Sequence, residues 1–305
     1  MTARVVKAIV LRQWRSAAIQ QAEELGLEVA GVDWLLREMA GVDRLRLHLA
    51  QSQEDLSLWC PFETIVDCWQ RHCEQRVPLQ YLLGFTTWRN LQLRVAPGVL
   101  IPRPETELMV DLALEQLHQD PSLASGEWVD LGTGSGAIPL ALALEVPPHY
   151  GKLHLHGVDR SPEALTIAQE NARRQGLTSI QWHLGSWFTP FASWQDQGKI
   201  SVMLSNPPYI PTLEINNLSA TVREHEPLLA LDGGPDGLEA IDYLIQTAPT
   251  YLRPGGVWLV ELMAGQGPIV EAKLEATGHY DRVCLRPDLA GIDRFVLART
   301  LTSGP

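Results

Sequence analysis

The chain has 305 residues, of which 45% are hydrophobic and 20% charged, values ordinary for a globular protein with one large domain or two unequal ones. No apolar run approaches the roughly 20 residues of a membrane span. The first 20 residues contain no clean apolar stretch followed by a small-residue cleavage site, so we expect no signal peptide and a cytoplasmic protein with no membrane partner. The net charge of −12 lies mostly beyond residue 83 and disfavours a nucleic-acid substrate, because phosphate contacts require a basic surface.

Residues 1–83 have the pattern of helices and form the first predicted domain. In residues 31–41 the apolar side chains recur at helical spacing, and Gly41 ends the segment. The cysteines of this part stand near His72, but their spacings match no familiar zinc pattern. We therefore expect reduced, partly buried helical thiols and no metal site at these positions: Cys60, Cys68 and Cys73.

Residues 84–96 show a different period. Apolar and polar side chains alternate on both sides of Arg89-Asn90, which predicts a β-hairpin that links two domains. The apolar side chains on one face of its second strand are Leu91, Leu93 and Val95.

Residues 97–305 form the second predicted domain, in which strands alternate with helices. A helix is expected to begin at Pro104, with Glu105 and Glu107 in its first turn. Predicted strands cover residues 127–132, 153–159, 180–185, 200–205, 256–262, 280–286 and 294–299. Helices separate most of them, so we expect an α/β fold with a doubly wound, mostly parallel sheet. The last two strands have no helix between them and should pair antiparallel.

A glycine-rich loop follows the strand at 127–132. Its members are Gly132, Thr133, Gly134, Ser135 and Gly136. Such loops let a ligand approach bare backbone, and Asp159 stands at the end of the next strand, where an acid can bind ribose hydroxyls. These residues also fit an NAD site. Asp130 beside the loop would repel a pyrophosphate but favours a cationic ligand, which points to S-adenosylmethionine.

The stretch SNPPYI, residues 205–210, ends a buried strand with two prolines. The side-chain oxygen of Asn206 and the backbone carbonyl of Pro207 can each accept one N–H of a planar NH2 group. Pro208 stiffens the turn, and Tyr209 offers a flat face for stacking. The loop therefore predicts a rigid socket that orients an amide or an exocyclic amine for methyl transfer.

The chain resembles the protein-(glutamine-N5) methyltransferases that modify peptide chain release factors. The resemblance covers nearly the whole chain and includes VLIPRPETELMVDLAL, VDLGTGSGAIPLALA, SNPPYI and REHEPLLALDGGPDGLEAI. NPPY alone also occurs in methyltransferases of DNA bases, whereas the first and last of these stretches are more specific. The resemblance implies a class I methyltransferase domain of seven strands, with a small N-terminal helical domain that recognises the substrate. It implies S-adenosyl-L-methionine as the cofactor and the Gln of a release factor's Gly-Gly-Gln motif as the acceptor.

Carried over by motif, the resemblance implies a role for each candidate residue. The loop from Gly132 to Gly136 lines the methionine part of the cofactor, Asp159 holds the ribose, and Trp187 packs near the adenine. Asn206 touches cofactor and substrate, and the rest of the socket consists of Pro207, Pro208 and Tyr209.

The chain departs from the family pattern at two places. Ser186 stands where the family commonly has an acid, and Glu261-Leu262-Met263 replaces Glu-x-Gly. Arg103 and Glu105 have either a structural role or a place at the border of the site.

Three other functions would each have a different signature. A nucleic-acid methyltransferase would bind DNA or RNA in a salt-sensitive way, which the negative charge disfavours. A non-catalytic interaction module would tolerate the loss of Asn206, and an NAD oxidoreductase has no evident use for SNPPYI. We expect a monomer that acts on release factors in translation termination.

Overall fold

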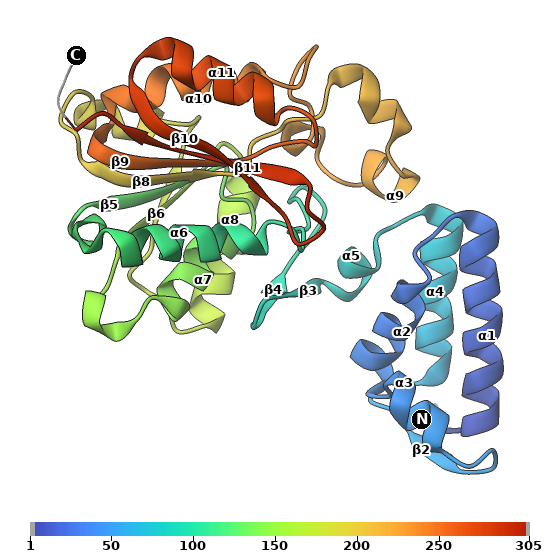
Figure 1. Cartoon of the computed structure of the whole chain (residues 1–305). Helices are drawn as coiled ribbons and strands as arrows, with labels where there is room; N and C mark the ends of the chain where they lie inside the picture. Colours follow the sequence, from blue (N-terminus) through green and yellow to red (C-terminus); the bar gives the residue numbers. More distant parts are fainter. Residues whose placement is uncertain (1–3, 303–305) are drawn as a thin grey trace. The chain divides into compact units, whose positions relative to one another are not determined.

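The computed structural model describes residues 4–302, which form two compact units (Figure 1). The first unit runs up to Gly84 and includes Ser219–His225, and the second consists of Phe85–Leu218 together with the chain from Glu226 onward. Each unit has a hydrophobic core of its own. The functional division into residues 1–83, 84–96 and 97–305 stays a prediction.

The first unit is mainly helical, as its apolar spacing indicates. Its main helices are α1 (Ala8–Leu25), α2 (Ala30–Leu35), α3 (Arg44–Leu49), α4 (Phe62–Gln75) and α5 (Leu79–Leu83), and α2 continues as a π-helical turn, Leu36–Ala40. Gly41 ends that turn with a left-handed φ of 68°, as predicted. The prediction of helices throughout residues 1–83 was wrong at two points. Strands β1 (Val5–Lys7) and β2 (Asp55–Ser57) pair antiparallel, and three residues are too short to produce a detectable alternation.

The cysteines of the first unit are free thiols packed among apolar side chains. Burial raises the pKa of both Cys68 and Cys73 to about 11, so these thiols stay protonated and unreactive at neutral pH. Within residues 4–302 no group of three or more His, Cys, Asp or Glu side chains is placed to hold a metal ion.

Strand β8 (Ile200–Ser205) stands near the middle of a seven-stranded sheet in the second unit, in the order β10-β11-β9-β8-β5-β6-β7. The other strands are β5 (Glu127–Leu131), β6 (His154–Asp159), β7 (Gln181–Leu184), β9 (Leu252–Glu261), β10 (Tyr280–Pro287) and β11 (Asp293–Thr300). Strand β11 pairs antiparallel with both β9 and β10, and the pairs among β5 to β9 are parallel. The predicted doubly wound sheet and its antiparallel last pair are confirmed.

Helices cover both faces of this sheet (Figure 1). Successive side chains of a strand point to opposite faces, so Trp128 packs with α6 (Glu107–Gln119) and α7 (Ala137–Glu145). The next residue, Val129, packs with α10 (Glu239–Thr247) and α11 (Gly267–Thr277) on the other face. Helix α8 (Pro162–Arg174) begins at the predicted cap, where the Ser161 hydroxyl accepts a hydrogen bond from Ala164 N.

The predicted hairpin is confirmed as β3 (Phe85–Trp88) and β4 (Leu91–Arg94). Its apolar face packs into the core of the second unit. Arg89 adopts a left-handed φ of 50° in the turn, and its guanidinium donates to Glu145 on α7 and to Asp111 on α6. These ion pairs hold a strained turn against the helices of the second unit.

Helix α6 begins three residues later than Pro104, the predicted start. Pro104, Glu105 and Thr106 form tight turns whose carbonyls accept from the N–H groups three residues ahead. The Thr106 side chain does not cap the helix, because its hydroxyl is used elsewhere. The amino-acid sequence gives no sign that the Thr106 hydroxyl bonds to a distant residue, so the predicted start of α6 is too early.

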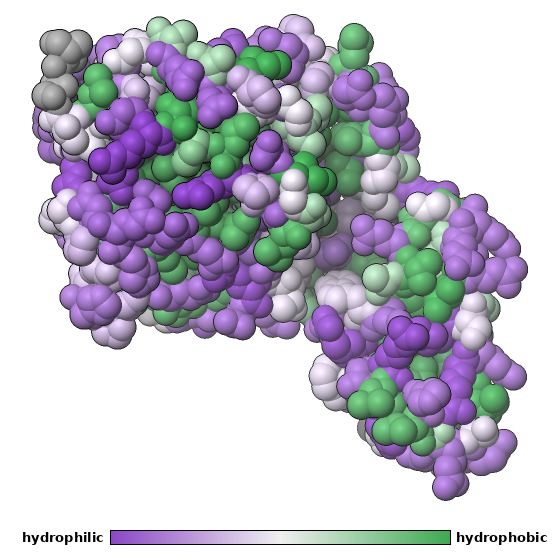
Figure 2. All heavy atoms as spheres, in the orientation of Figure 1, coloured by the Kyte–Doolittle hydropathy of each residue, from purple (hydrophilic) through white to green (hydrophobic). Residues whose placement is uncertain are grey.

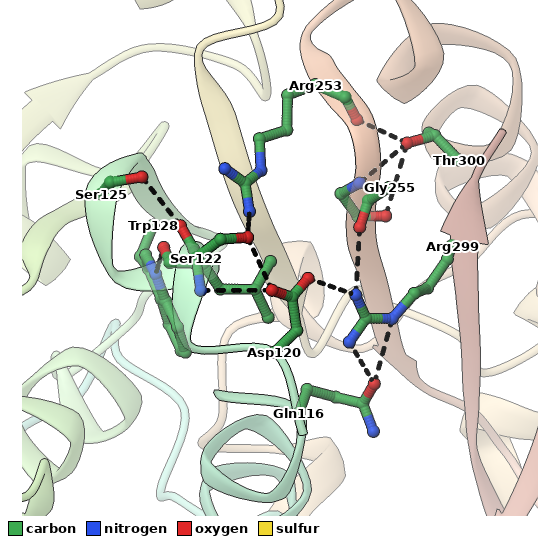
Figure 3. Close-up of polar contacts among 11 residues, drawn as sticks. Gln116, Asp120, Ser122, Ser125, Trp128, Arg253, Gly255, Arg299 and Thr300 are labelled. Atoms are coloured by element: carbon green, nitrogen blue, oxygen red, sulfur yellow. Dashed lines mark hydrogen bonds and ion pairs between the residues drawn. The ribbon is translucent and has the colours of Figure 1, made fainter. Parts of the chain in front are cut away.

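A polar network closes the end of the sheet near Gly255 (Figure 3). The Arg299 guanidinium on β11 donates to Asp120 Oδ2 at 3.0 Å, to Gln116 Oε1 at 2.9 Å and to the Gly255 carbonyl at 3.2 Å. Thr300 accepts from Gly256 N at 3.0 Å and donates to the Arg253 carbonyl at 2.6 Å. Figure 3 shows these groups converging from α6, β9 and β11.

We expect Arg299→Met to lower the stability of the protein by about 2 kcal/mol, or about 5 °C in Tm. The substitution keeps the apolar stem but leaves the buried Gln116 oxygen without its donor. Thermal unfolding by circular dichroism measures the change. Lys273→Met is the matched control, since its ion pair with Asp242 is exposed and should contribute less than about 0.5 kcal/mol. Equal losses in the two variants would contradict the role assigned to the network.

Hydrophilic side chains cover most of the face shown in Figure 2, with apolar ones scattered among them.

In the described part of the chain, every helix is too short or too polar to span a lipid bilayer.

Candidate active site

A pocket lies within the second unit, at the carboxyl ends of β5, β6 and β8. The neighbours of β5 are β6 on one side and β8 on the other, so the loop that follows β5 stands at the switch point where open α/β sheets bind ligands. The structure brings these predicted residues together in the pocket wall: Gly132, Thr133, Gly134, Ser135, Asp159, Trp187, Asn206 and Pro208. Four other predicted residues are not among those that line it: Asp130, Gly136, Pro207 and Tyr209.

The glycine loop leaves open space where a ligand can approach backbone. A Cβ added to Gly134 would meet no atom within 4 Å. Gly136 has a different reason to be glycine. Its φ is 81°, and a Cβ there would come within 2.9 Å of the Trp182 ring on β7 and 3.1 Å of Ala168 on α8, so glycine lets the start of α7 pack closely against these two elements.

Asp159 fixes the position of the loop. Its Oδ2 accepts from Gly134 N at 2.8 Å, and its Oδ1 accepts from Ser161 N at 2.9 Å. Burial raises the pKa of Asp159, whereas these backbone donors act in the opposite direction. Each carboxylate oxygen keeps a further lone pair, so Asp159 can still accept hydrogen bonds from a diol such as the ribose of a nucleoside.

Asp130 is a buried acid without a compensating cation. The side chain is 2% exposed, and within residues 4–302 neither carboxyl oxygen has a hydrogen-bond partner. Burial raises its pKa to about 7, although the nearby Thr133 hydroxyl partly opposes this. A buried carboxyl of this kind fits a positively charged ligand in the adjoining pocket, because the ligand would favour the ionised form.

Trp187 forms the side of the pocket beside Gly132. Its φ of 50° is unusual for a tryptophan, and a Cβ on Gly132 would be 3.8 Å from its ring. Ser186, where the family commonly has an acid, is exposed and its N–H donates to Thr189 Oγ1.

Asn206 connects the pocket to a buried hydrogen-bond chain. Its Nδ2 donates to Thr106 Oγ1 at 3.0 Å, and the Thr106 hydroxyl donates to Glu261 Oε2 at 2.6 Å. The Tyr209 hydroxyl donates to the other oxygen of Glu261 at 3.1 Å. Sequence reasoning missed Thr106 and gave Glu261 no role, because their contacts join residues 100 and 155 positions apart.

Tyr209 is held by hydrogen bonds at its hydroxyl and at its backbone carbonyl. Besides its hydroxyl contact, its backbone carbonyl accepts from Gln266 Nε2 at 3.0 Å. A Cβ on Gly237 would come within 2.3 Å of that same carbonyl, so the DGGPDG segment presses directly against the loop. Pro207 is buried. These contacts hold the loop in place, and the rigidity that its two prolines predict stays a prediction.

Arg103 holds another part of the pocket in place. Its guanidinium donates to Glu226 Oε1 at 2.8 Å, and the second oxygen of Glu226 accepts from Ile101 N. The Glu226 side chain is buried in this contact. Arg103 thus ties the LIPRP segment, which supplies Leu100 and Pro102 to the wall, to the chain at Glu226.

A methyltransferase domain model matches residues 124–288, more than half of the chain. The release factor glutamine methyltransferase of Synechocystis sp. is 47% identical over 293 residues, which cover 95% of this chain and 96% of that protein. The enzyme of the same name from Gloeobacter violaceus is 43% identical, with coverage of 95% and 97%. Among solved structures, the hMettl16 catalytic domain in complex with the MAT2A 3'UTR hairpin 6 shares the fold. Its TM-score is 0.51 at 15% identity, over 79% of this chain and 81% of that one.

Proposed function

We infer that this chain, which belongs to the family of release factor glutamine methyltransferases, methylates the side-chain amide nitrogen N5 of the Gln in the Gly-Gly-Gln motif of peptide chain release factors. The cofactor is S-adenosyl-L-methionine. The observation that carries the assignment of the site is the presence of Asn206 and the glycine loop in the wall of a single pocket.

The residues present fit this cofactor. Asp130 is the buried acid that a sulfonium or ammonium charge would compensate, and Asp159 stands at the end of β6 with lone pairs available for the ribose. Gly134 leaves its backbone open to the methionine part, and Trp187 offers a ring at the wall for the adenine. When bound, the cofactor supplies a methyl group made electrophilic by its sulfonium.

The chain's own residues contribute orientation and charge stabilisation. An amide nitrogen is a poor nucleophile because its lone pair is delocalised. Asn206 Oδ1 and the carbonyl of Pro207 are proposed to accept the two N–H groups of the substrate, which holds the nitrogen in line with the methyl group. The same acceptors stabilise the positive charge that develops on the nitrogen during transfer.

The proposed function is tested with purified, unmethylated release factor, S-adenosylmethionine and this protein. Mass spectrometry of the intact product and of its peptides should show one added methyl group on the Gln of the Gly-Gly-Gln motif. A release factor with that Gln changed to Ala is the control and should gain none. Labelling of DNA or RNA in a parallel tritium assay, with the release factor unlabelled, would overturn the assignment.

The first unit is proposed to contact the release factor, since a Gly-Gly-Gln loop alone offers little surface for specificity. Among the exposed large apolar side chains of this unit, the three with the highest exposed fractions are Leu45, Leu49 and Trp59. Tryptophan is common among residues that dominate the binding energy of protein interfaces.

Trp59→Ala is expected to raise KM for the release factor about five- to tenfold with little change in kcat. The ring is 68% exposed, so its removal should not unfold the unit. Steady-state kinetics measure the change, and a short Gly-Gly-Gln peptide serves as the control substrate whose KM should stay the same. A rise in KM for both substrates would place the effect in the catalytic unit instead.

Three further properties are proposed. The protein is proposed to act as a monomer. It works in the cytoplasm, where release factors meet ribosomes, and without direct contact to nucleic acid. Light scattering after size exclusion should give a mass near 33.9 kDa.

A further inference from the structure

We propose that Thr106 and Glu261 are positioning residues that fix which way the Asn206 carboxamide faces, so that its oxygen is presented to the substrate amide. The inference rests on the proposed function of Asn206 as an acceptor. Thr106 lines the pocket together with Asn206, whereas Glu261 is not among the lining residues. Both are proposed to act through Asn206 and not on the transferred group itself.

The three residues meet where separate segments of the second unit end. Asn206 follows β8, Glu261 ends β9, and Thr106 lies in the turns before α6. Strands β8 and β9 are parallel neighbours, with Ser205 opposite Val260, so Asn206 and Glu261 emerge side by side. Thr106 is 4% exposed and Glu261 is 1% exposed, so water does not compete for these hydrogen bonds.

The donors and acceptors in this series of hydrogen bonds follow from counting the available protons. An ionised carboxylate only accepts, and Glu261 accepts from the Thr106 hydroxyl and from the Tyr209 hydroxyl. Thr106 has one hydroxyl proton, which Glu261 uses. The contact between Thr106 and Asn206 at 3.0 Å must then use a proton of the Asn206 amide, so Nδ2 faces Thr106.

The opposite orientation is unfavourable for the same reason. Turning the carboxamide by 180° would bring Asn206 Oδ1 against Thr106 Oγ1, two acceptors without a proton between them. In the favoured orientation, no donor among residues 4–302 reaches Oδ1, and Asn206 lines the pocket. The atom left for a ligand is therefore the one that can accept an N–H.

Glu261 fixes both ends of the NPPY loop through this arrangement. One oxygen acts on Asn206 through Thr106, and the other holds Tyr209 directly. The charged groups that act on Glu261 are Arg294, which favours its ionised form, and Glu105, which opposes it. Burial raises the pKa of Glu261 to about 7, so the carboxylate is mainly ionised at pH 8, where the test is best made.

The test compares Thr106→Val with Thr106→Ser at pH 8. Valine keeps the shape but neither accepts nor donates, so kcat should fall about tenfold while the Kd of S-adenosylmethionine changes less than twofold. Serine restores the hydroxyl and should return kcat to within about threefold of the parent. Thr300→Val is the matched control, because this buried threonine also accepts one N–H at 3.0 Å and donates one hydroxyl at 2.6 Å (Figure 3). It should lower Tm to a similar extent without lowering kcat.

A double-mutant cycle separates positioning from a general structural role. In the Asn206→Ala background, Thr106→Val should cause no further loss of kcat, since Thr106 acts through Asn206. A further tenfold loss in the double variant, or full activity of Thr106→Val alone, would overturn the proposal.

A second readout needs no methyl acceptor. In the free protein labelled with ¹⁵N-asparagine, the Asn206 side-chain NH2 protons should exchange slowly with water and become fast in Thr106→Val. Unchanged exchange would count against the hydrogen bond whatever the activity. If the parent protein did not methylate a release factor, the proposed function would be wrong. The exchange measurement would still decide which way the Asn206 carboxamide faces.

Discussion

Asn206→Ala is expected to lower kcat for release factor methylation by about 10²-fold or more. The variant removes an acceptor that orients the substrate nitrogen and stabilises its developing charge. The Kd of S-adenosylmethionine should change much less, because the glycine loop and Asp159 remain in place. Single-turnover kinetics with saturating cofactor measure the loss in the chemical step.

Asn217→Ala is the control for this substitution. Asn217 is exposed, and its amide donates to Glu214 on the same turn, so kcat should stay within about twofold of the parent. Normal turnover by Asn206→Ala would show that the NPPY loop does not hold the acceptor nitrogen.

Binding of S-adenosylmethionine is expected to be about tenfold tighter at pH 8 than at pH 6, as the ionisation of Asp130 requires. In the free protein, burial raises the pKa of this acid to about 7, so it is mainly neutral at pH 6 and mainly charged at pH 8. A cationic ligand favours the charged form, which lowers the pKa in the complex. Binding below pH 7 must therefore release a proton, and affinity increases with pH until the free protein is ionised.

Isothermal titration calorimetry in two buffers of different ionisation enthalpy measures that proton. Asp130→Asn has the same shape and no charge, so it should bind 10- to 10²-fold more weakly at pH 8 and lose this part of the pH dependence. Any protons released or taken up by Asp159 and by the amino group of the ligand are the same in both proteins, so they cancel when parent and variant are compared. The same proton release in parent and variant would exclude Asp130 as its source.

Local patterns were sufficient to predict most of the second unit. The alternation around Arg89-Asn90, the cap at Ser161 and the antiparallel last strands depend on neighbours in sequence, and each is confirmed. The ends of β5, β6 and β8 could be placed from their apolar runs, and this brought most of the predicted pocket residues to one edge of the sheet.

The residues that sequence reasoning missed act through distant contacts. Thr106 was assigned to a helix, where threonine is unremarkable, and its hydroxyl contact with Glu261 spans 155 positions. Tyr209 was predicted as a stacking face, and its anchoring hydroxyl could not be foreseen without the position of β9. One available signal was Glu261 itself, an acid directly after the apolar run Val257–Val260, since such a buried acid requires donors.

The segment Ser219–His225 belongs to the first unit although its sequence lies inside the second. The His225 ring is hydrogen-bonded to the Gln75 carbonyl at 2.8 Å, and the next residue, Glu226, secures Arg103 and Ile101 at the pocket wall. A protein shortened to begin at Phe85 would keep this segment but remove its packing partners, one peptide bond away from a pocket anchor. A single truncation therefore cannot separate the methyltransferase unit from the first unit without disturbing the pocket. A loss of activity after such a truncation would not by itself measure substrate recognition.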